Sequence, residues 1–141
     1  MKTTQAIKQN AHPSFIIYDA SAGSGKTYSL VRSYLQAILH TNRPENYQSI
    51  LAITFTNKAA HEMKTRVLTQ LNEFSSKKIL LEPTEMFHEI VKQCGVDKEV
   101  IHQRAAKALH HILQNYGHFS ITTIDSLTHQ IVRTFARDLG L

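Results

Sequence analysis

The residues best suited to chemistry in this 141-residue chain form a run at positions 20–27 that reads Ala-Ser-Ala-Gly-Ser-Gly-Lys-Thr. The run matches the Walker A pattern of a phosphate-binding loop, with Ala20 in place of the first glycine. Gly23 and Gly25 permit the positive φ angles and the close approach of backbone to phosphate that such a loop needs. The spacing therefore predicts a site for a nucleoside triphosphate.

Two side chains of this loop are the candidate catalytic residues. Lys26 would reach the β- and γ-phosphates, and Thr27 would offer its hydroxyl to Mg²⁺ as the candidate metal ligand. Kinases, transporters, GTPases and helicases all use such a loop, so it identifies a ligand and not a reaction. The candidate cofactor-binding residues are the whole run: Ala20, Ser21, Ala22, Gly23, Ser24, Gly25, Lys26 and Thr27.

A second candidate site lies at Phe55, Thr56 and Asn57, directly after an apolar segment. If that segment is a strand of the same parallel sheet, these residues lie at the carboxyl edge, where ligands bind. Thr56 and Asn57 could hold a backbone phosphate at the start of the next helix, and Phe55 could stack on a base. The alternative is structural: Thr56 is only an N-cap, Phe55 is core, and the nearby basic side chains are a solvated helix face.

Hydrophobic periodicity predicts the elements that position these residues. Strands are expected at 14–19, 49–55 and 119–124, and helices at 26–40, 57–74, 84–94, 97–116 and 125–139. The expected apolar stripes are Leu30, Val31, Leu35, Ile38 and Leu39 on the first helix, Ala60, Met63, Val67 and Leu71 on the second, and Leu127, Ile131, Val132 and Phe135 on the last. Residues 75–83 should be a connector, with Asp97 capping the helix that follows Gly95.

Composition indicates a folded chain of domain size. Hydrophobic residues are 42% and charged residues 19%, and the net charge is +5, with the basic excess in residues 1–75. No apolar stretch is long enough to span a bilayer, and the start is polar, so a cytoplasmic location is expected. One cysteine excludes an internal disulfide, and nine histidines without cysteine or carboxylate partners at metal spacing do not predict a zinc site.

Three segments together resemble the UvrD/RecB/AddA group of superfamily 1 DNA helicases. Residues 54–66, Thr-Phe-Thr-Asn-Lys-Ala-Ala-His-Glu-Met-Lys-Thr-Arg, are similar to helicase motif Ia, and the loop at 20–27 is similar to motif I. Residues 121–127, Ile-Thr-Thr-Ile-Asp-Ser-Leu, resemble motif Ib. The resemblance covers about residues 14–74 and 119–141, and the helices between them correspond to a variable insertion.

The resemblance implies an α/β fold, a P-loop NTPase (RecA-like) parallel sheet with flanking helices. Residues 1–74 would be the P-loop βαβ portion of helicase lobe 1A, residues 75–118 a helical insertion like 1B, and residues 119–141 the return strand and helix. It further implies ATP and Mg²⁺ as cofactors, single-stranded DNA as partner, movement from 3′ to 5′, and work in DNA repair or recombination. By resemblance the DNA-side residues are Phe55, Thr56, Asn57, Thr123 and Ser126.

Asp125 has two interpretations, because an aspartate at a strand end is also where a P-loop enzyme places its Walker B carboxylate for Mg²⁺. The preceding strand is polar and no glutamate follows Asp125, so a DNA-side or helix-capping role is the favoured hypothesis. The alternative function is another P-loop NTPase, a phosphotransferase or transport ATPase, with Asp125 as the magnesium ligand.

The sequence departs from a complete helicase because it contains no Asp-Glu pair and none of the later motifs. It therefore looks like an N-terminal segment that needs the rest of a helicase chain, with its second lobe and in some relatives a nuclease subunit, to act. This segment alone is expected to bind ATP weakly and to hydrolyse almost none. A truncated, non-catalytic remnant is the remaining alternative.

Overall fold

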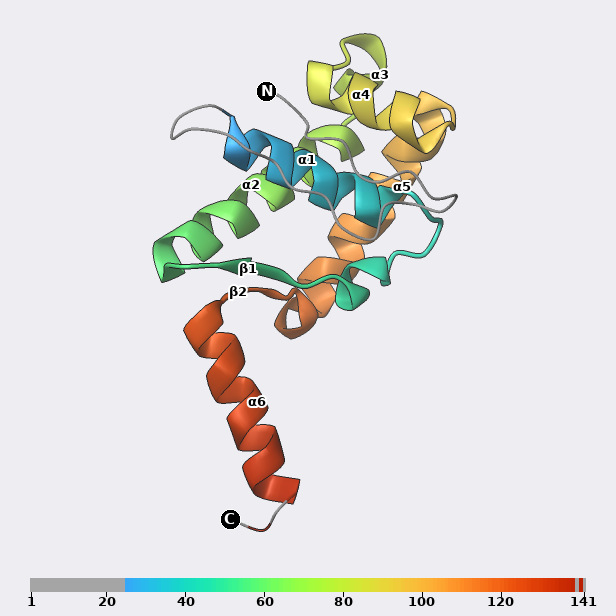
Figure 1. The fold of residues 1–141 in the computed structure, drawn as a ribbon. Helices are drawn as coiled ribbons and strands as arrows, with labels where there is room; N and C mark the ends of the chain where they lie inside the picture. Colours follow the sequence, from blue (N-terminus) through green and yellow to red (C-terminus); the bar gives the residue numbers. More distant parts are fainter. Residues whose placement is uncertain (1–24, 139, 141) are drawn as a thin grey trace, which may run out of the picture.

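The computed structural model describes residues 25–138 and residue 140, and Figure 1 shows their arrangement. The first expected strand, at 14–19, and residues 20–24 of the phosphate loop lie outside the described residues. In chain order the elements are α1 (Lys26–Leu39), η1 (Asn46–Ser49), β1 (Ala52–Thr54), α2 (Asn57–Ser75), α3 (Lys78–Leu81), α4 (Glu85–Cys94), α5 (Lys98–Gln114), η2 (Tyr116–His118), β2 (Ile121–Thr123) and α6 (Ile124–Asp138).

The described part of the chain is a mostly helical α/β structure with one small parallel sheet. β1 and β2 pair in parallel, with Ala52 opposite Ile121 and Thr54 opposite Thr123. Both strands are shorter than predicted. Ser49 belongs to the 3₁₀ helix η1, where Ile50 N donates to the Tyr47 carbonyl, so the amino-terminal part of the apolar run is bonded locally instead of across the sheet.

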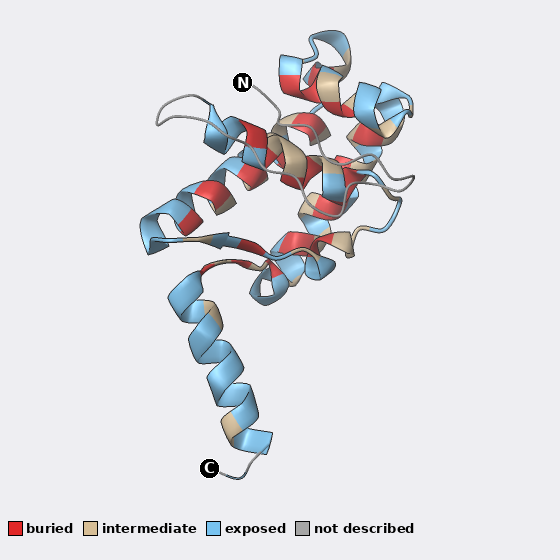
Figure 2. Cartoon of the chain, viewed as in Figure 1, coloured by how far each residue is buried: buried red, intermediate tan, exposed pale blue. Residues whose placement is uncertain are grey.

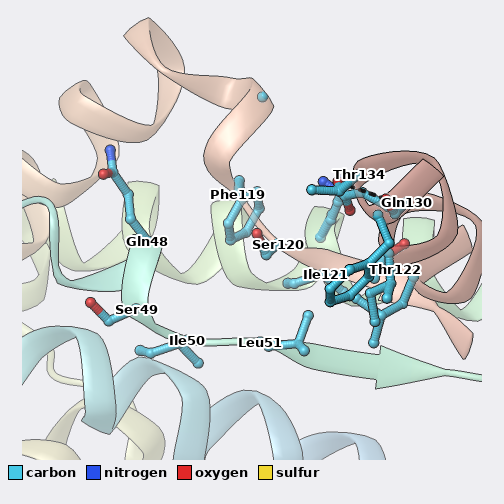
Figure 3. Close-up of a pocket in the computed structure, with 15 residues that line it drawn as sticks. Gln48, Ser49, Ile50, Leu51, Phe119, Ser120, Ile121, Thr122, Gln130 and Thr134 are labelled. Atoms are coloured by element: carbon cyan, nitrogen blue, oxygen red, sulfur yellow. Dashed lines mark hydrogen bonds between the residues drawn. The ribbon is translucent and has the colours of Figure 1, made fainter. Parts of the chain in front are cut away.

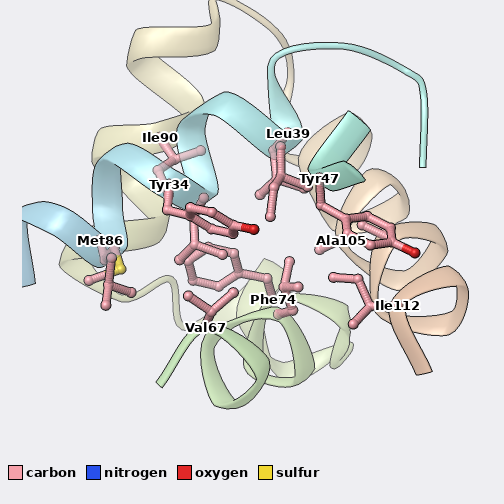
Figure 4. Close-up of a cluster of buried hydrophobic side chains, with 14 of the residues drawn as sticks. Tyr34, Leu39, Tyr47, Val67, Phe74, Met86, Ile90, Ala105 and Ile112 are labelled. Carbon is pink, nitrogen blue, oxygen red and sulfur yellow. The ribbon is translucent and has the colours of Figure 1, made fainter. Parts of the chain in front are cut away.

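Helices α1, α2 and α5 form the body above these strands (Figure 1). The stripe predicted on α2 is buried, and so are Val31, Leu35, Ile38 and Leu39 of α1, which confirms the helical spacing. Leu30 is the exception, because 47% of its surface is exposed. Tyr47, Phe74, Phe87 and Phe119 are among the largest buried side chains, and Phe74 and Phe87 pack edge to face with ring centres 5.0 Å apart. Figure 4 shows part of the buried core, with Tyr34, Tyr47 and Phe74 among the side chains between α1, α2 and α5.

Segment 75–118 contributes to the same core. The expected connector holds a short helix that the sequence did not predict, α3, whose Ile79 is 2% exposed. Thr84 caps α4, because its hydroxyl accepts a hydrogen bond from Phe87 N. Asp97 precedes α5 as predicted, but its side chain makes no capping hydrogen bond. Ile90, Ile101 and further residues of α4 and α5 join the cluster formed by α1 and α2. The division into lobe and insertion stays a prediction.

Helix α6 extends away from this body (Figure 1). It has no buried residue, and Figure 2 draws it almost wholly in the colour of exposed residues. Of its predicted apolar side, Ile131, Val132 and Phe135 are 47%, 58% and 62% exposed. Leu127, the first residue of the stripe, is half-buried, whereas no described residue covers the other three.

None of the described helices is long and apolar enough to cross a membrane. Among the same residues, no three histidine, cysteine or acidic side chains gather in a way that could hold a metal ion.

Candidate functional site

Two of the three segments that the sequence singled out, 54–66 and 121–127, meet at the carboxyl ends of β1 and β2. Because the strands run in parallel with Thr54 opposite Thr123, the chain leaves both strands at the same edge of the sheet. Helix α2 begins after β1 and α6 begins after β2. The register therefore brings the segment at 55–57 beside the segment at 123–126, which the sequence alone did not require.

At the end of β1, Phe55 is 87% exposed, more than any other large hydrophobic side chain in the described residues. The interpretation of Phe55 as core is therefore wrong. Thr56 is the N-cap of α2, as its extended backbone and the bond from Ala59 N to its hydroxyl at 3.1 Å show. Thr56 and Asn57 are both exposed, so the capping role leaves their side chains open to a ligand.

Thr54 joins the two strand ends, a role that was not predicted from the sequence. Its hydroxyl donates to the Thr56 carbonyl at 3.1 Å and lies 3.4 Å from the Thr122 carbonyl of the neighbouring strand. The first contact closes the turn that carries Phe55, and the second ties that turn to β2. A polar residue inside an apolar strand was the available signal, because a partly buried hydroxyl must find an acceptor.

At the end of β2, two hydroxyls are coupled. Thr123 is 4% exposed, and its Oγ1 accepts a bond from Ser126 N at 3.2 Å and donates to Ser126 Oγ at 2.9 Å. Ser126 is exposed. Of the two predicted DNA-side residues here, the structure places Ser126 on the surface and the Thr123 side chain behind it.

Asp125 lies in the first turn of α6 and is exposed. The side chain that caps this helix is that of Thr123, so the capping role suggested for Asp125 is taken by its neighbour. A carboxylate in the first turn interacts favourably with the positive end of the helix dipole.

The start of α1 carries the described part of the phosphate loop. Gly25 has φ +83°, a left-handed backbone conformation that favours glycine. The described residue that precedes α1 is Gly25, which has no side chain to cap the helix, and the first turn contains no acidic residue. Lys26 and Thr27 are exposed. This helix start offers amides, an ammonium and a hydroxyl, which is a donor set suited to a phosphate with Mg²⁺.

Beside this helix start lies a cavity of about 380 Å³ between α1, α2 and α4, lined in part by Tyr28, Arg66, Gln70 and Glu85. Burial and the carboxylates of Glu89 and Glu85 raise the pKa of Tyr28, so the side chain is a neutral phenol at physiological pH.

A wider groove of about 580 Å³ lies between α6 and the strands (Figure 3). One wall is Gln48 to Leu51, and the opposite wall includes Gln130 and Thr134 of α6. Lys64 of α2 also lines it, with its ammonium 5.3 Å from the centre of the Tyr116 ring.

Comparison with known proteins identifies a family. The model of the UvrD/REP helicase N-terminal domain matches residues 1–141. An ATP-dependent helicase/nuclease subunit of Bacillus cytotoxicus is 32% identical over 125 residues, which is 89% of this chain and 8% of that protein. The protein of the same name from Lactobacillus acidophilus is 31% identical over 137 residues, 97% of this chain and 9% of that protein.

A third relative is the "ATP-dependent DNA helicase Rep" of Buchnera aphidicola, 40% identical over 79 residues, which is 52% of this chain and 11% of that protein. The chain therefore spans about a tenth of the length of these relatives. No solved structure matches it.

Proposed function

Because this chain belongs to the UvrD/REP helicase N-terminal domain family, we propose that it is the nucleotide-binding part of an ATP-dependent DNA helicase with a RecA-like P-loop fold. In this proposal ATP and Mg²⁺ bind at residues 20–27, where Lys26 contacts the β- and γ-phosphates and Thr27 contacts the metal. The start of α1 supports this assignment, because it has the donors and its first turn contains no acidic residue.

Single-stranded DNA binds, in the same proposal, across the carboxyl ends of β1 and β2. Phe55 stacks on a base, and Asn57, Thr56 and Ser126 bind the backbone at two adjacent helix starts. The observation that carries the proposal is the 87% exposure of Phe55 at this edge. Exposing so large an apolar side chain costs stability unless a ligand covers it, and a base provides a flat apolar face.

These 141 residues contain no Asp-Glu pair. We infer that the carboxylates that complete the magnesium site, and the arginines that stabilise the transferred phosphate, come from other regions of a longer protein. The proposed cellular work is DNA repair or recombination with movement from 3′ to 5′. A nuclease subunit is a proposed partner, since the names of two relatives describe them as belonging to a helicase/nuclease.

The test is the substitution Lys26→Ala in the complete protein. Loss of the ammonium should reduce DNA-stimulated ATP hydrolysis to background, because nothing else in the loop carries its positive charge to the phosphates. Binding of labelled oligo(dT) without nucleotide should stay within about twofold of the unsubstituted protein, since Lys26 lies outside the DNA contact. Lys92→Ala, on the exposed surface of α4, is the matched control for loss of one lysine. Unchanged hydrolysis in the Lys26 variant would refute the assignment.

A further inference from the structure

The starts of α2 and α6 lie side by side, and each is capped by a threonine, but the two caps differ in what their protons can do. At α2, Thr56 is exposed, and its oxygen accepts from Ala59 N, which leaves its own proton free for a ligand. At α6, Thr123 is 4% exposed, so its hydroxyl cannot meet a ligand directly.

The hydrogen bonds of Thr123 fix the direction of the proton that it holds. Its oxygen accepts from Ser126 N at 3.2 Å, and its proton goes to Ser126 Oγ at 2.9 Å. A buried hydroxyl that left its proton without an acceptor would lose a hydrogen bond that water can no longer replace, so this direction is preferred over the reverse one. With its oxygen occupied as an acceptor, Ser126 directs its own proton outward, away from Thr123.

We infer that Thr123 is a positioning residue that makes Ser126 a hydrogen-bond donor to a phosphate oxygen of single-stranded DNA. The inference rests on the proposed function, which places DNA at this edge. Thr56 and Ser126 then present two outward O–H donors, one at each helix start, and both are close to first-turn amides that favour a negative ligand. A phosphate oxygen only accepts, so a hydroxyl held as a donor is the state that binds it.

The inference is tested in the complete protein by measuring the affinity for fluorescein-labelled oligo(dT) by fluorescence anisotropy. The variants are Ser126→Ala, Thr123→Val, Thr123→Ser and the double variant Thr123→Val with Ser126→Ala. Valine keeps the shape of threonine but removes both hydrogen bonds, whereas serine keeps the hydroxyl. Thr84→Val removes the same kind of cap from α4, away from the strand ends, and controls for loss of a helix cap.

The expected result is that Ser126→Ala and Thr123→Val each weaken binding about threefold to tenfold. The double variant should be no weaker than either single one, because both substitutions remove the same donor. Thr123→Ser should bind like the unsubstituted protein, and Thr84→Val should also leave affinity unchanged. Rescue by serine separates positioning of the hydroxyl from a packing role.

Three outcomes would overturn the inference. If Thr123→Val weakens binding and Ser126→Ala does not, Thr123 does not act through Ser126. If the two effects add in the double variant, the two residues act independently. If circular dichroism shows that the Thr123→Val variant is unfolded, the test rests on Ser126→Ala alone. Unchanged affinity for oligo(dT) in the Ser126→Ala variant then rejects the donor role. Failure of the unsubstituted protein to bind oligo(dT) is a different result, because it rejects the proposed function itself.

Discussion

Phe55 is the residue whose position says most about how this edge of the sheet is used. It follows Leu51 and Ile53, which are 50% and 44% exposed, at every second position, and it lies beyond Thr54, the last paired residue of β1. The sequence could identify this side chain only as either core or ligand-binding. Exposure decides against core, because no described neighbour packs over the ring.

Phe55→Ala should weaken binding of oligo(dT) by the complete protein about tenfold, since stacking of a base on an aromatic ring contributes about 1–3 kcal/mol. Phe55→Tyr should keep most of the affinity. In both variants the free energy of unfolding should change by less than about 1 kcal/mol because the ring is already exposed. Leu81→Ala is the control, since Leu81 is 84% exposed on α3, and it should change neither quantity. Equal affinities of the alanine variant and the parent at two salt concentrations would count against stacking.

Asp125 separates the helicase proposal from a P-loop enzyme that uses this carboxylate for magnesium. Asp125→Asn should raise affinity for oligo(dT) about twofold at low salt, because it removes a negative charge beside the proposed phosphate contact, and ATP hydrolysis should persist. Asp97→Asn, at the exposed start of α5, should alter neither. Loss of hydrolysis in the Asp125 variant, with oligo(dT) binding unchanged, would instead favour the magnesium role.

At the scale of elements, the helices were the predictable part of the fold. α1, α2, α4 and α5 begin and end within about two residues of their predicted bounds, because each has an apolar stripe and a clear start or stop. The strands β1 and β2 were predicted too long, since an apolar run does not tell where hydrogen bonding to a neighbour ends. α3 was missed because a helix of four residues carries too little periodicity.

The candidate site was only partly predictable for the same kind of reason. The phosphate loop and the segment at 55–57 are each an unbroken run of residues, so each could be found as a sequence motif. The pairing that brings Thr123 and Ser126 beside residues 55–57 depends on strand register, and the burial of Thr123 depends on packing. Neither the strand register nor the burial of Thr123 can be predicted from a local sequence pattern.

Arg104 connects two elements at the end of α1 opposite to the phosphate loop. Its guanidinium donates to the carbonyls of Leu39 and His40, the last turn of α1, at 2.8 and 2.9 Å. Arg104→Met should speed amide hydrogen exchange of residues 26–40 about fivefold, measured by mass spectrometry on the complete protein. The effect stays modest because the buried Arg104 Nε has no hydrogen-bond partner in the described structure. Methionine removes this unsatisfied donor and so regains part of the lost stability. Lys107→Met, exposed one turn on, is the control, and equal exchange in both variants would contradict the capping role.

At the scale of the whole molecule, one side of the sheet and α6 carry an apolar surface that no other described part of the chain covers. It comprises Leu51, Ile53, Ile124, Ile131, Val132 and Phe135, all at least 44% exposed. Parallel sheets are normally covered on both faces, so such a surface favours association.

The isolated 141-residue chain should therefore self-associate at high concentration, with a sedimentation coefficient that rises with protein concentration. Val132→Ser with Phe135→Ser should reduce this dependence without lowering the melting temperature, because both side chains are exposed. Leu113→Ser on α5, 61% exposed but outside this surface, should leave the association unchanged. A concentration-independent sedimentation coefficient for the parent chain would argue against the prediction.

The pairing of β1 with β2 also has a kinetic consequence. Thr54 and the carbonyl of Thr122 that lies beside its hydroxyl are 68 positions apart along the chain, and α2 to α5 fill the interval. Closing so large a loop is entropically costly until those helices have packed, so the strand ends assemble late, whereas each helix can form from local contacts. Substitutions that destabilise the intervening helices should therefore slow or prevent the pairing of the two three-residue strands. This holds even when every side chain at the strand ends is unchanged.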